Sequence, residues 1–217
     1  MQINCDFARP IIVHGKRIDW VPSPAPGVDR KMLYRDGAEV ARATSIVRYA
    51  PGSAFPEHLH TGGEEILVLS GTFQDEHADY PAGSYFRNPP GTRHSPAAVD
   101  GCEIFVRLWQ FRTGDSAQIA FPPERATGVV FDDGFERVSI EDWQGAIHHP
   151  NPRGLELIVL AGTVRVEGEG EGEELSAQSW LRLPAGYPLV AEAEGARVWL
   201  KDAPLQHMDV LPLPGAA

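Results

Sequence analysis

The chain has 217 residues, 42% of them hydrophobic, and a formal net charge of −11 at pH 7. This composition is that of a globular protein, and an acidic chain without a basic cluster argues against nucleic-acid binding. No apolar run is long enough to span a bilayer, and residues 1–20 lack a signal-peptide pattern. Cys5 and Cys102 form no metal-binding or disulfide motif, so we expect reduced thiols and a cytoplasmic protein.

Short apolar segments run along the whole chain and are separated by Gly, Pro, Asn and Asp. Such segments are typical of β-strands, and no long stretch has the period of an α-helix. We predict strands at 43–49, 65–69, 84–88, 102–111, 156–160, 163–166, 179–183 and 196–201. The pattern therefore predicts an all-β protein, a sandwich or a barrel.

Three blocks of the sequence occur twice and in the same order. Residues 63–72 align with 154–163 at an offset of 91, residues 84–91 align with 179–186 at an offset of 95, and residues 101–107 align with 195–201 at an offset of 94. Matches in register over three blocks indicate an internal repeat. We predict two tandem copies of one β-domain, 1–125 with an N-terminal arm and 126–217.

The first copy carries a cluster of metal-binding residue types: His58, His60, Glu64 and, after a Pro-Pro-Gly turn, His94. Residues i and i+2 of a strand point to the same face, so His58 and His60 are directed into one space. Three imidazoles and one carboxylate suit a divalent metal ion. We predict that these four residues bind one such ion.

The residues leave the identity of the metal open. The cluster contains no thiolate, which excludes a structural zinc site built from cysteines. Zn, Fe, Mn, Ni and Cu all accept imidazole together with carboxylate. Four protein ligands would complete a zinc tetrahedron, whereas six-coordinate Fe(II) or Mn(II) would keep two positions for water, substrate or dioxygen.

Five further side chains are candidates for the wall of a pocket: Phe55, Ile66, Val68, Tyr85 and Arg87. Ile66 and Val68 share a strand face with Glu64. Tyr85 and Arg87 share one face of their strand, and Phe86 and Asn88 share the other. The sequence does not decide which of these two pairs faces the pocket.

The second copy has lost most of the cluster. The repeat offsets align His58 with His149, and the other three ligand positions with Asn151, Leu155 and Leu189. Leu155 and Leu189 would fill the space with apolar side chains. We therefore expect one metal ion per chain, bound in the first copy.

Two segments of the first copy resemble the motifs of the cupin superfamily: residues 52–71, with His58, His60 and Glu64, and residues 83–94, which end at His94. Residues 20–110 are similar in particular to the ChrR-type cupins, and the weaker second copy fits a bicupin. The resemblance implies two tandem cupin jelly-roll barrels and a metal, often zinc, on His58, His60, Glu64 and His94, with iron, manganese or nickel as alternatives. It also implies a regulatory role in the response to singlet oxygen and peroxides, with a sigma factor or other protein as partner.

The same subgroup resembles acetylacetone dioxygenase, an iron enzyme that cleaves β-diketones and holds its metal with three histidines. His58, His60 and His94 would supply these ligands. The chain lacks the H-x3-C-x2-C zinc motif of the anti-sigma domain that precedes the cupin in ChrR. From the resemblance we expect a stress-sensing regulatory cupin, and the alternative is a small-molecule dioxygenase. A small-molecule ligand and a homodimer are further expectations.

Overall fold

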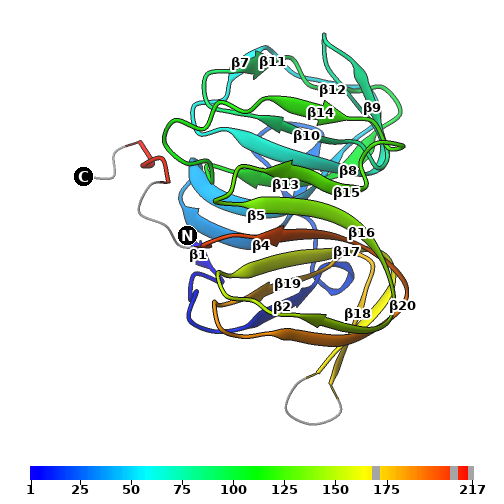
Figure 1. Ribbon diagram of the computed structural model, residues 1–217. Coiled ribbons are helices and arrows are strands. Elements are labelled where there is room, and N and C mark those ends of the chain that lie inside the picture. Colours follow the sequence, from blue (N-terminus) through cyan, green and yellow to red (C-terminus); the bar gives the residue numbers. More distant parts are fainter. Residues whose placement is uncertain (168–171, 206–209, 215–217) are drawn as a thin grey trace. The chain divides into compact units, whose positions relative to one another are not determined.

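The computed structural model describes residues 1–167, 172–205 and 210–214. Apart from one 3-10 helix, η1 (Gly15–Arg17), the regular elements of this part of the chain are β-strands (Figure 1). The all-β class is confirmed. No helix within the described residues is long and apolar enough to cross a membrane.

The chain divides into two compact units. Unit 1 comprises Met1–Cys5, Asp19–Ala126 and the described residues 210–214, and unit 2 comprises Asp6–Ile18 and the chain from Thr127 to residue 205. The sequence analysis placed all of residues 1–125 in the first unit. Residues 6–18 instead belong to unit 2, because β2 (Ile11–His14) pairs with β19 (Ser179–Leu183) and completes its sheet.

Unit 1 is built on one large antiparallel sheet in the order β1-β4-β5-β13-β8-β10-β14. The separate ladder of β7 and β11 lies at one end of this unit (Figure 1). The strands of unit 1 are β1 (Gln2–Ile3), β3 (Val21–Pro22), β4 (Val28–Gly37), β5 (Ala41–Tyr49), β6 (Ser53–Ala54), β7 (His58–Leu59), β8 (Glu64–Gln74), β9 (Asp79–Pro81), β10 (Tyr85–Asn88), β11 (Arg93–His94), β12 (Ala97–Ala98), β13 (Cys102–Leu108) and β14 (Ile119–Phe121).

Unit 2 is a second antiparallel sheet in the order β15-β16-β20-β17-β19-β2, with β18 paired to β17. Its other strands are β15 (Gly128–Asp132), β16 (Arg137–His149), β17 (Leu155–Val166), β18 (Glu173–Ser176) and β20 (Leu189–Asp202). The repeat seen in the sequence corresponds to this architecture, because β8, β10 and β13 of unit 1 align with β17, β19 and β20 of unit 2.

Each unit has its own apolar core, formed by the alternate residues of its strands that face inward. In unit 1, Ile66 and Val68 of β8 pack with Phe86 of β10 and Val106 of β13. In unit 2, Leu157 and Val159 of β17 pack with Leu181 of β19 and Val198 of β20. The two cores thus use matching strands of the repeat.

Residues 61–63 form the turn between His60 and the start of β8, and its glycines are required by close packing. A Cβ atom at Gly62 would overlap the indole of Trp109. Gly63 has a φ of +74°, and a Cβ atom there would lie 2.6 Å from Phe111. The Trp109 amide donates to the Gly63 carbonyl at 3.2 Å, which ties the turn to the end of β13.

We predict that Gly62→Ala destabilises unit 1, because the added methyl group forces Trp109 out of its position. Overpacking of this kind costs about 1–3 kcal/mol in the free energy of unfolding, measured by denaturant titration. The cost should shrink in a Trp109→Leu background, since the overlapping atoms are then gone. An undiminished cost in that background would contradict the assignment.

Candidate metal centre

Four side chains of unit 1 converge at one end of the barrel: His58, His60, Glu64 and His94. β7 pairs with β11 and places His58 directly opposite His94. His60 follows β7, and Glu64 is the first residue of β8 after the 61–63 turn. One potential ligand atom from each of the four residues lies within 4.8 Å of the others. The structure thus brings together the whole set that the spacing singled out.

The three imidazole rings meet edge to face around one space. Ring centroids are 5.1 Å apart for His58 and His60, 5.1 Å for His58 and His94, and 4.5 Å for His60 and His94. The Nε2 atoms of His60 and His94 each lie 3.3 Å from Oε1 of Glu64. His60, Glu64 and His94 are buried, whereas His58 is exposed.

The outward-facing nitrogen of each ring has an acceptor. Nδ1 of His60 lies 2.9 Å from the Thr92 hydroxyl, which itself donates to the Pro89 carbonyl at 2.7 Å. Because the hydroxyl proton is already used, Nδ1 of His60 must donate and its Nε2 is left without a proton. Nδ1 of His58 faces the Pro56 carbonyl at 3.4 Å, with the same consequence.

The inner end of His60 fits a metal ligand. Its Nε2 atom is buried and has no hydrogen-bond partner among the described residues. A buried nitrogen lone pair without a donor is unfavourable, and a cation in the central space would remove that cost. The donor set of imidazoles and one carboxylate is that of a divalent transition metal.

Glu64 is held in place by Asn88, whose amide Nδ2 donates to Oε1 of Glu64 at 2.9 Å. The two residues lie opposite each other in the β8–β10 register. Sequence analysis named neither Asn88 nor Thr92 as a partner of the ligands. The period of two in β10 allowed Asn88, but it did not say which face of β10 points inward.

The environment shifts the pKa values of two ligands in opposite directions. Burial lowers the pKa of His60 below its usual 6.5, and this outweighs the effect of Glu64. Burial would also lower the pKa of His94, but the hydrogen bond to Asp75 and the charge of Glu64 outweigh it, so that this pKa is raised. Nδ1 of His94 lies 3.2 Å from Oδ2 of Asp75.

A pocket of about 330 Å³ adjoins the centre, and His94 and Asn88 form part of its wall. The rings of Tyr80 and Phe86 stack beside it with centroids 4.4 Å apart. Its other lining residues come from the β8–β9 turn, β11 and the start of β14: Asp75, His77, Arg93, Gln118, Ile119 and Ala120. Of the four residues of the cluster, His94 is the one that lines this pocket.

Two of the candidate pocket residues do not line the pocket, and the pair that the sequence left undecided is Phe86 and Asn88. Tyr85 and Arg87 lie on the opposite face of β10: Tyr85 donates to Glu65 at 2.6 Å and Arg87 pairs with Asp115 at 2.7 Å. The inward face carries Phe86 and Asn88.

The remaining candidates are found elsewhere. Ile66 and Val68 lie in the apolar core on the face that carries Glu64. Phe55 is half-buried against Tyr49, with ring centroids 5.5 Å apart, and does not line the pocket beside His94.

In unit 2 the corresponding positions have become structural. Asn151, aligned with His60, donates to the carbonyls of Pro184 and Tyr187 at 2.7 and 2.9 Å and accepts from Gly154. Leu155 and Leu189 are fully buried members of the unit 2 core. The apolar filling that the sequence predicts is therefore present.

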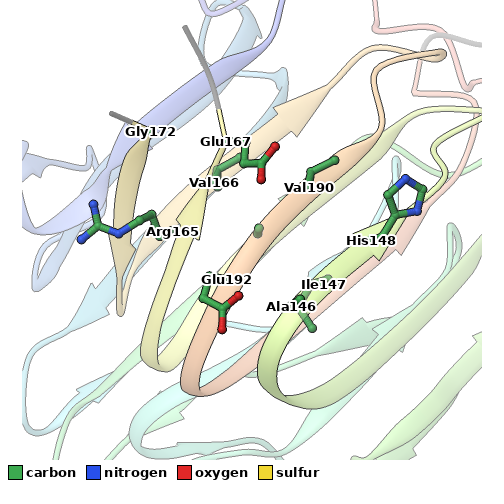
Figure 2. Close-up of a pocket in the computed structure, with 10 residues that line it drawn as sticks. Ala146, Ile147, His148, Arg165, Val166, Glu167, Gly172, Val190 and Glu192 are labelled. Carbon is green, nitrogen blue, oxygen red and sulfur yellow. The ribbon is translucent and has the colours of Figure 1, made fainter. Parts of the chain in front are cut away.

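A larger pocket of about 530 Å³ lies in unit 2, and Asn151, Leu155 and Leu189 are not among its lining residues. Figure 2 shows its polar side chains, among them His148, Arg165 and Glu192, spread over β16, β17 and β20 without converging on one point. Among the described residues, the group suited to a metal ion is the one in unit 1. Volume alone therefore does not locate the chemistry of this protein.

Comparison with known proteins agrees with this architecture. The family model of the ChrR cupin-like domain matches residues 8–112. No curated protein sequence matches the chain.

Several solved structures share the fold. A candidate dioxygenase from Nostoc punctiforme has a TM-score of 0.73 at 15% identity, over 94% of this chain and 86% of that chain. The pirin YhhW from Escherichia coli, in complex with nickel(II), has a TM-score of 0.68 at 18% identity, over 90% of this chain and 99% of that chain. A cupin 2 conserved barrel domain protein from Leptotrichia buccalis has a TM-score of 0.61 at 15% identity, over 93% of this chain and 99% of that chain. Residues 8–112 are thus similar to the ChrR cupin-like domain, and these solved structures share the fold of the chain.

Proposed function

We propose that unit 1 binds one divalent metal ion through His58, His60, Glu64 and His94. We also propose that the protein, with this ion bound, acts as a dioxygenase on a small molecule. The observation that carries the proposal is the buried, unpartnered Nε2 of His60 at the centre of the four-residue cluster. The exposure of His58 and the pocket beside His94 support access of a small molecule to the ion.

The residues around the centre have two roles: some orient the metal-binding side chains, and others form the wall that a small molecule would contact. Thr92 and the Pro56 carbonyl orient two imidazoles, and Asn88 orients the Glu64 carboxylate. The Tyr80–Phe86 stack offers a planar apolar wall to a bound molecule. A bound Fe(II) ion would supply the coordination sites and redox chemistry that reaction with dioxygen requires.

Arg93 gives the pocket a preference for ligands that carry a negative charge. Its guanidinium is largely exposed and lies 3.4 Å from Glu57 in a surface ion pair. Because surface ion pairs are weak, an anionic group of a ligand can compete with Glu57 for Arg93. A planar molecule with an enolate or carboxylate group fits this combination of aromatic wall and cation.

A regulatory role is the second candidate, and the match of residues 8–112 to the ChrR cupin-like family favours it. In that role the metal-bound unit would sense an oxidised molecule and act through a sigma factor or another protein. Zinc would suffice for this function, whereas turnover with dioxygen calls for a redox-active ion such as iron. Metal identity therefore bears directly on the choice.

We predict about one metal ion per chain in wild-type protein, measured by elemental analysis after purification without added metal. His60→Ala should reduce the content to near zero, because it removes one of the buried ligands. His149→Ala, at the position of unit 2 that aligns with His58, is the control histidine substitution and should leave the content unchanged. Full metal content in His60→Ala would overturn the ligand assignment.

We predict that metal affinity falls strongly between pH 7 and pH 5, since the imidazoles must be neutral to bind. The raised pKa of His94 makes protons compete at this ligand already above pH 6.5, and the lowered pKa of His60 delays competition there until below pH 6.5. Isotherms for zinc at several pH values measure the effect. An affinity that stays flat over this range would mean that the histidines are not the ligands.

We predict oxygen uptake by the Fe(II)-loaded protein with a β-diketone probe such as acetylacetone, followed with an oxygen electrode. The zinc-loaded protein is the control and should be inactive, because zinc has no redox chemistry. Absence of uptake by fully Fe(II)-loaded protein would reject this substrate class. Uptake that is equal with zinc would show that the reaction does not occur at this centre.

A further inference from the structure

The turn between β8 and β9 forms hydrogen bonds with the segment that carries His94. Three consecutive residues of this turn region, Gln74, Asp75 and Glu76, each bind that segment through a side-chain oxygen. Oδ2 of Asp75 lies 3.2 Å from Nδ1 of His94. Oε2 of Glu76 accepts a hydrogen bond from the Ser95 amide at 2.8 Å, and Oε1 of Gln74 accepts one from the Val99 amide at 3.0 Å. The turn thus fixes both the backbone and the ring of one predicted ligand.

Asp75 is itself rigidly placed. Its side chain is 3% exposed, and its Oδ1 atom accepts from the amides of His77 and Ala78 at 2.8 and 3.0 Å. The Asp75 amide donates to the Ala78 carbonyl at 3.1 Å and closes the turn. With Oδ1 occupied by the backbone, Oδ2 is the oxygen that faces His94.

An ionised carboxylate can only accept hydrogen bonds, so Nδ1 of His94 must carry the proton in this contact. When the ring is neutral, as metal binding requires, the other ring nitrogen, Nε2, presents its lone pair to the central space, 3.3 Å from Oε1 of Glu64. We propose that Asp75 is a positioning residue that fixes the metal-binding tautomer of His94. This inference rests on the proposed metal binding by unit 1.

The repeat provides an internal comparison. The offset between the copies rises from 91 before this turn to 95 after it, so unit 2 has four more residues here. Part of that longer connection, residues 168–171, lies outside the described residues. The ligand position after it is Leu189, which has no ring to orient. The short turn and the histidine it would hold thus occur together in unit 1, and both are changed in unit 2.

Asp75→Asn tests the proposal with almost no change in shape. The amide oxygen is expected to keep the bonds from His77 and Ala78, because an amide nitrogen there would face two donors. The new Nδ2 group then faces His94 and donates to Nδ1, which moves the ring proton to Nε2, the metal-facing atom. Loss of an outer partner of a metal ligand typically weakens binding by about 10–100-fold.

The experiment measures zinc affinity by competition with a chromophoric chelator. The ring tautomer of His94 is measured by 15N NMR of the metal-free protein, at a pH high enough for the ring to be neutral. Glu76→Gln is the matched control: it removes the same charge from the neighbouring residue, which contacts the Ser95 amide and not a ligand ring. Asp75→Asn should lose about 10–100-fold in zinc affinity and show Nε2–H at His94, whereas Glu76→Gln should stay within about threefold of wild type with Nδ1–H.

Each outcome has a distinct meaning. Wild-type affinity together with the wild-type tautomer in a folded Asp75→Asn variant overturns the role of Asp75. If Asp75→Asn does not fold, the wild-type spectrum decides, because an Nε2–H tautomer of His94 in the metal-free wild type also overturns it. Failure of the wild-type protein to bind zinc at all would reject the proposed metal site instead.

Discussion

The alternation of side chains along β8 is the constraint on which the rest of unit 1 depends. Glu64 and Glu65 are neighbours, yet they point to opposite faces of the sheet. Glu64 joins the histidine cluster, and Glu65 accepts from Tyr85 at 2.6 Å and from Arg107 at 2.7 Å on the other face. A shift of one residue in the register of β8 would exchange the two carboxylates and would leave each buried without its partners. The register with β10 and β13 therefore sets the metal centre and the buried ion pair together.

The repeat shows that the two faces of the sheet have diverged to different extents between unit 1 and unit 2. On the face opposite the metal centre, unit 2 keeps the pattern: Glu156, aligned with Glu65, accepts from Trp180 at 2.8 Å, and Lys201, aligned with Arg107, pairs with Glu136 at 2.9 Å. On the inner face, Leu155 and Leu189 replace two ligands and join the apolar core. A buried ion pair is costly to break one residue at a time, whereas the ligand positions of unit 2 are filled by apolar side chains without loss of the fold.

The same contrast explains what could be predicted from the sequence. The four ligands follow from local spacing, because an i, i+2 pair on a strand and a rigid turn fix directions without knowledge of the whole fold. The partners of these ligands do not follow, since Asp75 and Asn88 reach them from a turn and a strand whose placement depends on the register of β8. The face of β10 was undecided for this reason, and the contact of Asn88 with Glu64 resolves it. The long strand β16 was missed because its outward-facing residues are polar and charged and interrupt the apolar pattern.

The three histidines of the candidate metal centre face hydrogen-bond acceptors of different kinds, which all have the same effect. A hydroxyl whose proton is already donated faces His60, a backbone carbonyl faces His58, and a carboxylate faces His94. In the neutral rings, each of them draws the ring proton to Nδ1 and leaves Nε2 with a lone pair directed inward. Without a cation, these lone pairs would lie beside the Glu64 carboxylate in a largely buried space, where electrostatic repulsion is weakly screened. Such an arrangement favours a positive charge in the space between the four residues, either a proton on a ring nitrogen or a metal ion.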